Sequence, residues 1–203
     1  MRWIIRCDPL LRGAPRRGAL AVAAVLLVAA SAHAESFPNL KPANPQPASD
    51  ALAPGLAVEY ASIMVRHVDE LAGAGNWRKG PPLTALKYKS GGGAVLTSGE
   101  NDGVGARIKG FIKFDKNGRY LLATQSNDGV RVRLGGSMVV NDPGVHPDQF
   151  SENAELMISQ PGWYPLEVLY FERKNTSTLE LYWQPPEASE FAIVPAEAFA
   201  NLK

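Results

Sequence analysis

The chain has 203 residues, with 21 lysines and arginines against 20 aspartates and glutamates, a formal net charge of +1. This near-neutral balance lacks the strong positive excess of nucleic-acid-binding proteins, so we expect no nucleic-acid partner. The single cysteine, Cys7, excludes an intramolecular disulfide, and the stability of the fold therefore has to rest on a hydrophobic core.

The N-terminus, residues 1–34, has the features of a signal peptide. Several arginines precede an apolar run over residues 18–30, and Ala32-His33-Ala34 forms a small-x-small cleavage signal. We expect cleavage before Glu35 and export to the periplasm or the exterior, with no transmembrane span left after cleavage. An uncleaved anchor is the alternative, and the Arg16-Arg17 pair leaves the general and twin-arginine routes open.

Cleavage would leave 16 basic and 19 acidic side chains, a net charge of −3, because the first 34 residues hold five arginines and one aspartate. A chain of the remaining length buries about 70% of its unfolded surface on folding, which is enough for one core. Residues 35–54 follow, with five prolines and few large apolar side chains. Because proline fixes φ and removes a hydrogen-bond donor, we expect a disordered Pro-rich linker or tail there.

From Gly55 onward, short apolar-alternating runs are separated by turns rich in Gly, Asn and Asp. This regular spacing predicts an all-β domain, an antiparallel β-sandwich or barrel, over residues 55–200. Within it, residues 55–64 predict a strand and residues 67–72 a short helix. Residues 73–106 are Gly-rich and predict irregular structure.

Residues 118–136 carry the strongest local pattern. Residues 119–125 are rich in β-forming side chains, and residues 130–134 alternate apolar side chains with arginines. Between them lies Ser126-Asn127-Asp128-Gly129, a set of residue types that favours tight turns. The pattern predicts two strands of a β-hairpin, with a side-chain amide and a carboxylate on its rim.

A late strand over residues 163–171 is apolar on both faces, which predicts burial between two layers. Trp163 lies in it and Trp183 in the next strand, and their periodicity favours a place in the core over the alternative, a sugar-stacking platform. Five basic residues also fall on shared outward positions, for which a solvated face is favoured over contact with an acidic polysaccharide: Arg107, Lys109, Lys113, Arg131 and Arg133.

Catalysis requires a nucleophile, a base and a group that orients them. The sequence after residue 34 has only two histidines and contains no phosphate loop, dinucleotide fingerprint or zinc-ligand spacing. His67 fits a partly buried structural position, whereas His146 lies in a predicted loop and is the better candidate for a ligand contact. We therefore expect a protein that is not an enzyme.

The pattern Gly118-Arg-Tyr through Ser126-Asn-Asp-Gly129, followed by an alternating strand and a glycine, resembles the signature of the protective-antigen 14 domain family, a β-barrel module. Further segments resemble the family in its order: residues 55–60, 108–112, 161–170, 179–185 and 194–199. The resemblance spans about residues 55–200 and implies a β-sandwich or barrel of the protective-antigen 14 type.

In the sugar-binding fungal adhesins of that family, two successive acidic residues hold a calcium ion across a cis peptide, and the ion binds sugar hydroxyls. The resemblance therefore implies Asn127 and Asp128 as metal ligands and calcium as the candidate cofactor. Asn127 replaces the first acid, and Asn175 is a shifted substitute for a ligand in a loop that also carries Arg173 and Lys174. The alternative is a structural turn in which Asp128 caps backbone donors.

Together, these observations predict an exported, non-catalytic carbohydrate-binding module for envelope or extracellular glycan. The predicted ligand-binding residues are Asn127, Asp128, His146, Asp148 and Asn175, with Asp142 on a neighbouring loop. Two alternatives stay open: a structural or protein-interaction module of the cell envelope, and an accessory domain to a separate glycan-active enzyme.

Overall fold

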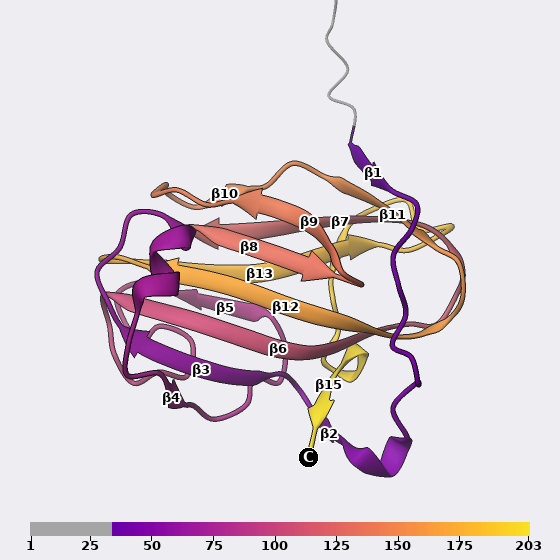
Figure 1. Cartoon of the computed structure of the whole chain (residues 1–203). Helices are drawn as coiled ribbons and strands as arrows, with labels where there is room; N and C mark the ends of the chain where they lie inside the picture. Colours follow the sequence, from indigo (N-terminus) through magenta and orange to yellow (C-terminus); the bar gives the residue numbers. More distant parts are fainter. Residues whose placement is uncertain (1–33) are drawn as a thin grey trace, which may run out of the picture. The chain divides into compact units, whose positions relative to one another are not determined.

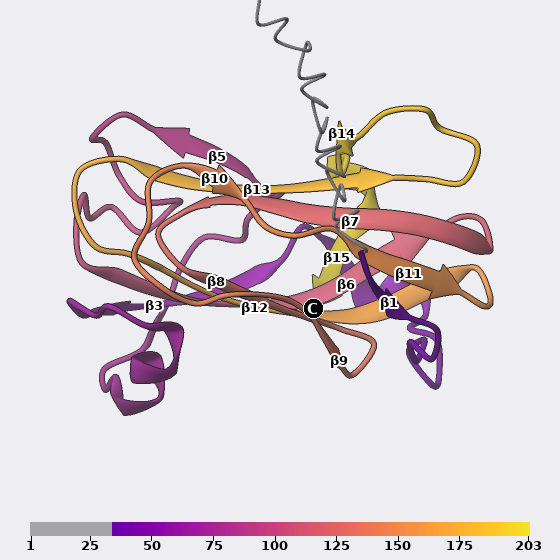
Figure 2. The same ribbon diagram turned by 90° about the horizontal axis from the view of Figure 1, so that it is seen from above.

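The computed structural model describes residues 34–203, which form two β-sheets packed face to face (Figures 1 and 2). The first sheet contains β1 (Glu35–Phe37), β5 (Lys87–Ser90), β7 (Gly118–Asn127), β10 (Gln149–Phe150), β11 (Ala154–Ile158), β13 (Ser177–Gln184) and β14 (Ala192–Ile193). The second contains β2 (Leu52–Pro54), β3 (Ala57–Ser62), β4 (Arg78–Lys79), β6 (Val104–Phe114), β8 (Val130–Leu134), β9 (Ser137–Asp142), β12 (Gly162–Glu172) and β15 (Phe199–Leu202). The predicted all-β sandwich is confirmed.

Three 3-10 helices complete the described elements: η1 (Ser49–Ala51), η2 (Val68–Gly73) and η3 (Ala196–Ala198). Within residues 34–203, no helix is long and apolar enough to cross a membrane. The predicted signal peptide and its cleavage signal lie almost wholly outside the described residues, so the structure does not bear on them.

Alternation along the central strands builds the core between the sheets. In β12, Tyr164, Leu166 and Val168 are buried, while Pro165 and Glu167 between them are exposed. Successive side chains of a strand point to opposite faces, so this pattern places one face of β12 on the core. Burying each such side chain contributes about 1.5–3 kcal/mol of hydrophobic free energy, so the long central strands dominate the stability of the domain.

The predicted β-hairpin over residues 118–136 is wrong, because β7 and β8 belong to different sheets. β7 pairs with β10, β11 and β13, whereas β8 pairs with β9 and β12. Asp128 and Gly129 therefore carry the chain from one sheet to the other. Turn-forming residue types favour a sharp change of direction, but they do not determine which strand each arm pairs with, since that depends on distant partners.

Residues 35–54 are packed against the sandwich, in contrast to the disordered tail predicted from their prolines. β1 pairs in parallel with β11, and β2 pairs with β15. Between them Leu40 is buried in the core, and the Ala43 backbone N–H donates to the Trp163 carbonyl at 2.8 Å. Proline correctly indicated extended backbone here, but hydrogen bonds and packing to distant segments hold that backbone in place.

The strand and short helix predicted over residues 55–72 are present as β3 and η2. η2 lies on the outer face of β12, where Val65, Val68, Leu71 and Phe171 form a second, small apolar cluster. His67 precedes η2, and its Nδ1 accepts the Asp69 backbone N–H at 3.2 Å. His67 is therefore a helix cap, in agreement with the structural role predicted for it.

The prediction that both tryptophans belong to the core requires correction. Trp183 is half-buried and packs on the core against Phe114 and Tyr120, with ring centroids 6.0 and 5.8 Å away. Trp163 is half-buried on the outer face of the sheet, beside Lys113 on the neighbouring strand. Because both faces of β12 carry apolar side chains, alternation alone does not identify the core face.

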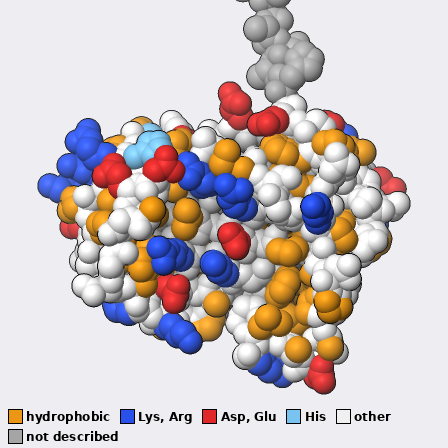
Figure 3. Space-filling model, in the orientation of Figure 1, with side chains coloured by type: hydrophobic (Ala, Val, Ile, Leu, Met, Phe, Trp, Pro, Cys, Tyr) orange, Lys and Arg blue, Asp and Glu red, His pale blue; other side chains and the backbone are white. Residues whose placement is uncertain are grey.

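The basic residues of β6 and β8 do share one outer face, on both sides of β12. Arg107 and Arg131 flank Leu169 in register, and Lys109 and Arg133 flank Glu167. Figure 3 shows basic side chains around acidic ones across this face. The mixture of charges is typical of a solvated surface, and it agrees with the solvated face predicted from the sequence.

Candidate functional site

The predicted ligand residues gather at one end of the sandwich, where the chain crosses between the sheets. We call this the rim site and define it as Asn127, Asp128, the loop 143–148 and the loop 173–176. The crossover follows β7, the first loop follows β9, and the second joins β12 to β13. Three segments distant in sequence therefore meet because the ends of their strands meet.

Asp128 connects the two loops. The residue is 4% exposed, and the His146 backbone N–H donates to Oδ1 at 3.2 Å while the Arg173 backbone N–H donates to Oδ2 at 2.8 Å. Hydrogen bonds to an ionised acceptor are about twice as strong as those between neutral groups. The carboxylate thus fixes both loops at once, which is the capping role that the structural-turn alternative assigned to it.

Asn127 is also buried and faces the late loop. Its Nδ2 donates to Thr176 Oγ1 at 2.9 Å, and its backbone carbonyl accepts the Tyr170 hydroxyl. The peptide bond that joins Asn127 to Asp128 is cis. The Asn127 amide therefore orients the 173–176 loop, and Asp128 holds the backbone of that loop from a second point.

Asp148 contributes a partly exposed carboxylate to the rim site. The Thr178 hydroxyl donates to Oδ1 at 2.9 Å, and Lys89 Nζ lies 2.6 Å from Oδ2. Burial tends to raise the pKa of Asp148, but the hydrogen bonds from Lys89 and Thr178 outweigh it and lower that pKa. At neutral pH the group is an anionic acceptor beside a cationic donor, with 29% of its side chain exposed.

His146 and Asn175 lie at the margins of the rim site. His146 Nε2 is 3.3 Å from Asp142 Oδ2, without the geometry of a hydrogen bond. Asn175 is exposed at φ +76°, and its backbone N–H donates to Asp102 Oδ1 at 2.7 Å. The structure therefore brings the loops of all five predicted residues together and leaves the Asn175 side chain facing solvent.

Glu172 was not among the predicted site residues, and it is 0% exposed at the end of β12. Neither of its carboxylate oxygens has a hydrogen-bond partner among residues 34–203. Burial, and then the negative charges of Asp102 and Asp128, raise the pKa of Glu172 to about 7. The alternation of side chains along the strand indicates that Glu172 faces the core, because it continues the series Tyr164, Leu166, Val168 and Tyr170.

Among residues 34–203, the buried polar side-chain atoms without a hydrogen-bond partner lie mainly at the end of the sandwich that carries the rim site. They are Thr124 Oγ1, Ser126 Oγ, His146 Nε2, Arg173 Nε and both oxygens of Glu172. Buried polar groups in folded proteins are nearly always hydrogen-bonded, so such exceptions are informative. Their concentration indicates a place where polarity is retained at a cost in stability, as functional sites often show.

The oxygens present do not fit the calcium ion implied by the resemblance. Calcium takes six to eight oxygen ligands, usually from several carboxylates. Here Asp128 is the one carboxylate of the crossover, and a backbone N–H group takes up one lone pair on each of its oxygens. In residues 34–203 no three His, Cys, Asp or Glu side chains are grouped so that they could hold a metal ion. The rim site is therefore best described as a set of hydrogen-bonding groups.

The fold and the loop-built site define a two-sheet β-sandwich that presents a polar rim at one end. The model of the PA14 domain family matches residues 96–197, just over half of the chain, and the chain therefore belongs to this family. The predicted family is confirmed. No curated protein matches the chain.

Solved structures share the fold at low sequence identity. The PA14 domain of the antifreeze protein MpAFP is 12% identical, with a TM-score of 0.64 over 76% of this chain and 94% of that one. The A domain of epithelial adhesin 9 from Candida glabrata, in complex with Galb1-4GlcNAc, is 13% identical, with a TM-score of 0.62 over 82% and 97%. A PA14 sugar-binding domain from an RTX adhesin is 14% identical, with a TM-score of 0.57 over 73% and 99%.

Proposed function

We propose that the protein is an exported, non-catalytic carbohydrate-binding module that holds an envelope or extracellular glycan at the rim site without a metal ion. The observation that carries the proposal is the crossover itself, where the Asp128 carboxylate accepts hydrogen bonds from both the 143–148 loop and the 173–176 loop. Two solved neighbours with this fold support it: one is a sugar-binding domain, and the other was solved with a disaccharide.

The chemistry of the rim suits hydroxylated ligands. A sugar hydroxyl both donates and accepts a hydrogen bond, so it pairs with an anionic acceptor and a cationic donor placed side by side. Asp148 and Lys89 form such a pair, and the amide of Asn175 lies free on the facing loop. A rim already fixed by Asp128 loses little further conformational freedom on binding, which favours affinity.

The proposal is tested by screening the purified protein on a glycan array in the presence of a chelator. For a glycan that binds, Asp148→Asn should weaken binding about tenfold, which corresponds to 1.4 kcal/mol. Asn175→Gly should weaken it less, because glycine keeps the positive φ and loses only the amide. The matched control is Glu187→Gln, which removes an exposed carboxylate outside the rim site and should leave binding unchanged.

Three results would contradict the proposal. Binding that survives both rim variants would place the glycan elsewhere, and binding that needs calcium would contradict the metal-free site. We also expect calcium and chelator to give the same melting temperature for the wild type. If no glycan binds while envelope extract yields a specific protein partner, the structural or interaction module is the correct alternative.

A further inference from the structure

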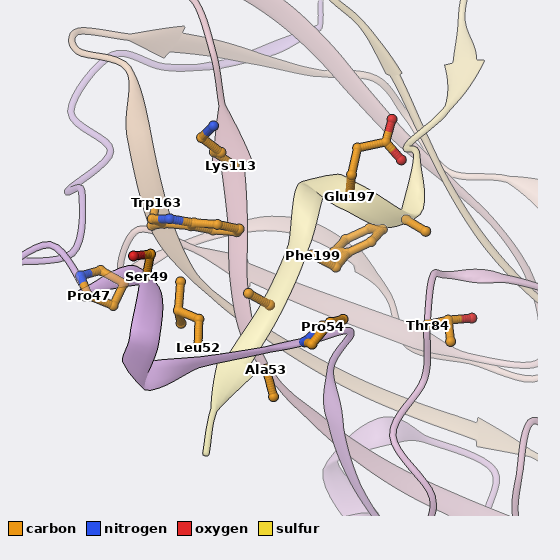
Figure 4. Close-up of a pocket in the computed structure, with 12 residues that line it drawn as sticks. Pro47, Ser49, Leu52, Ala53, Pro54, Thr84, Lys113, Trp163, Glu197 and Phe199 are labelled. Carbon is orange, nitrogen blue, oxygen red and sulfur yellow. The ribbon is translucent and has the colours of Figure 1, made fainter.

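A second concave site lies at the other end of β12, far from the rim site. It is a wide pocket of about 730 Å³ (Figure 4). Trp163 stands at the start of β12 and Glu172 at its end. With about 3.3 Å per residue along a strand, roughly 30 Å separate the two ends. A small ligand bound at one site therefore does not touch the other site.

The wall of this pocket is formed by Trp163, whose backbone is firmly held. The Trp163 N–H donates to Gln46 Oε1 at 2.8 Å, and its carbonyl accepts from Gln46 Nε2 at 2.9 Å and from the Ala43 N–H at 2.8 Å. The ring itself is only half-buried, and its side chain lines the pocket. A large aromatic ring that is fixed in place but open to solvent is suited to contact a ligand.

The remaining lining is mainly apolar. Figure 4 shows Leu52, Ala53 and Pro54 below the Trp163 ring and Phe199 across from it. In Figure 3 apolar side chains gather at the lower right, over η1, β2 and β15. Small-molecule sites typically measure about 300–1,000 Å³ and combine an apolar lining with a few polar groups, and this pocket has both properties.

Polar groups of opposite sign border the apolar lining. Lys113 lies beside Trp163, and Glu197 projects from η3 on the other side (Figure 4). Both side chains are exposed, and Lys113 Nζ also pairs with Asp115 at 2.9 Å. A cationic donor and an anionic acceptor together suit a ligand with no net charge whose neighbouring hydroxyls both donate and accept.

The shape of this edge argues against a peptide added as a new strand. β2 is the outer strand of its sheet, but it has only three residues and ends in Pro54. A short edge strand that carries proline offers few backbone groups for pairing. The side chains of the pocket, rather than the backbone of its edge, therefore have to make the contacts with a ligand.

We propose that this pocket is a second, metal-independent binding site for a neutral saccharide, with the apolar face of a sugar ring stacked on Trp163. Lys113 and Glu197 then bond hydroxyls at the edge of the ring, and the Trp163 indole N–H is a further donor. With the rim site at the opposite end, one domain would hold two segments of glycan. The residues of the pocket support this assignment, which does not rest on the function proposed for the rim site.

The test uses the protein from Glu35 onward in chelator, titrated with cellotetraose, chitotetraose and maltotetraose by calorimetry and by NMR of the indole N–H groups. At least one of these oligosaccharides should bind saturably and shift the Trp163 indole signal. Trp163→Ala should weaken that binding about tenfold or more, and Trp163→Phe should retain part of it because a ring remains. Glu197→Gln, a change at an exposed side chain, should weaken binding without altering the melting temperature.

Glu167→Gln is the matched control, an exposed carboxylate of β12 outside the pocket lining, and should change nothing. The proposal is overturned if none of the three oligosaccharides binds, or if binding is unaffected by both Trp163→Ala and Glu197→Gln. It is also overturned if Asp148→Asn removes the same binding, since the sugar would then occupy the rim site. Failure of the rim proposal alone leaves the Trp163-dependent binding in place, so the two failures are distinguishable.

Discussion

Glu172 is a carboxylic acid enclosed by the protein, at the end of a strand whose other core-facing residues are apolar or aromatic. An ionised carboxylate without a partner is strongly disfavoured in such surroundings, so the group retains its proton to a higher pH than usual. The neighbouring charges of Asp102 and Asp128 act in the same direction. Glu172 is therefore neutral in mildly acidic solution and a destabilising charge in alkaline solution.

This predicts a pH-dependent stability. The pKa of Glu172 is raised from 4.5 to about 7 in the folded protein, so the folded state binds this proton more tightly than the unfolded state. The resulting stabilisation is complete below pH 4.5 and is lost as the pH rises through about 7. It amounts to about 3 kcal/mol at 1.36 kcal/mol per pKa unit. Urea unfolding at pH 5 and pH 8 measures it.

Glu172→Gln should remove most of this difference, because the amide does not titrate. Glu167→Gln, at an exposed position of the same strand, should leave the pH dependence as it is in the wild type. Equal pH dependence in the wild type and Glu172→Gln would show that Glu172 is ionised at little cost in the folded protein.

Asp128 leads to a second prediction about a single side chain. In Asp128→Asn one acceptor oxygen becomes an NH2 group, so the backbone N–H of either His146 or Arg173 loses its partner. Leaving a buried donor unsatisfied costs about 1–3 kcal/mol, and we expect the free energy of unfolding to fall by that amount. Denaturant unfolding measures it, and an unchanged midpoint would show that the two loops do not depend on this carboxylate.

Among the elements, the crossover between β7 and β8 depends on Gly129. A Cβ at this position would lie 2.5 Å from Phe171 Cε1, 2.7 Å from the Pro143 carbonyl oxygen and 2.8 Å from the Gly144 carbonyl oxygen. The crossover can approach β12 and the 143–148 loop this closely only because residue 129 has no side chain. Gly129 therefore lies between the rim site and the second apolar cluster and packs closely against both.

Gly129→Ala should therefore destabilise the protein by about 1–3 kcal/mol, the usual cost of overpacking, and should displace the 143–148 loop. The matched control is Gly144→Ala, where an added Cβ meets nothing within 4 Å. Thermal melts and the amide NMR signals of residues 143–148 distinguish the two. A fully stable Gly129→Ala protein with unchanged loop signals would show that the packing here is looser than described.

Residues 35–54, which precede β3, also contribute to the stability of the sandwich. Leu40 is 4% exposed, and the Lys41 N–H donates to the Gly135 carbonyl at 3.0 Å. We expect Leu40→Ala to lower the free energy of unfolding by about 2–5 kcal/mol, as core leucine truncations do, while Lys41→Ala at an exposed position should be nearly neutral. Limited proteolysis that readily removes residues 35–54 from the wild type would contradict this.

For the whole molecule, the first described strand begins at Glu35, the residue that follows the predicted cleavage signal. If the predicted signal is cleaved before Glu35, the exported protein retains all of β1. N-terminal sequencing of protein recovered outside the cytoplasm checks this, and an intact Met1 would indicate an uncleaved anchor. A variant with Ala32 and Ala34 both changed to leucine should block cleavage, because the signal requires small residues.

The sequence by itself determined the fold class and the family. Alternation of period two and regularly spaced turns reflect local backbone geometry, and these local signals predict strands well. The same signals marked Asn127 and Asp128 as a sharp turn and placed His146 in a loop. The strands, the turn and the loop each depend on a few residues that are adjacent in the sequence.

Only the tertiary structure decided which strands pair and which face of each strand is buried. It separated β7 from β8, turned Trp163 outward into a pocket, packed residues 35–54 on the sandwich and enclosed Glu172. These outcomes depend on partners far away in the chain, such as β13 for β7 and Gln46 for Trp163. Burial and pairing are properties of the assembled sheets, so the same local pattern is compatible with several arrangements until the long-range contacts select one.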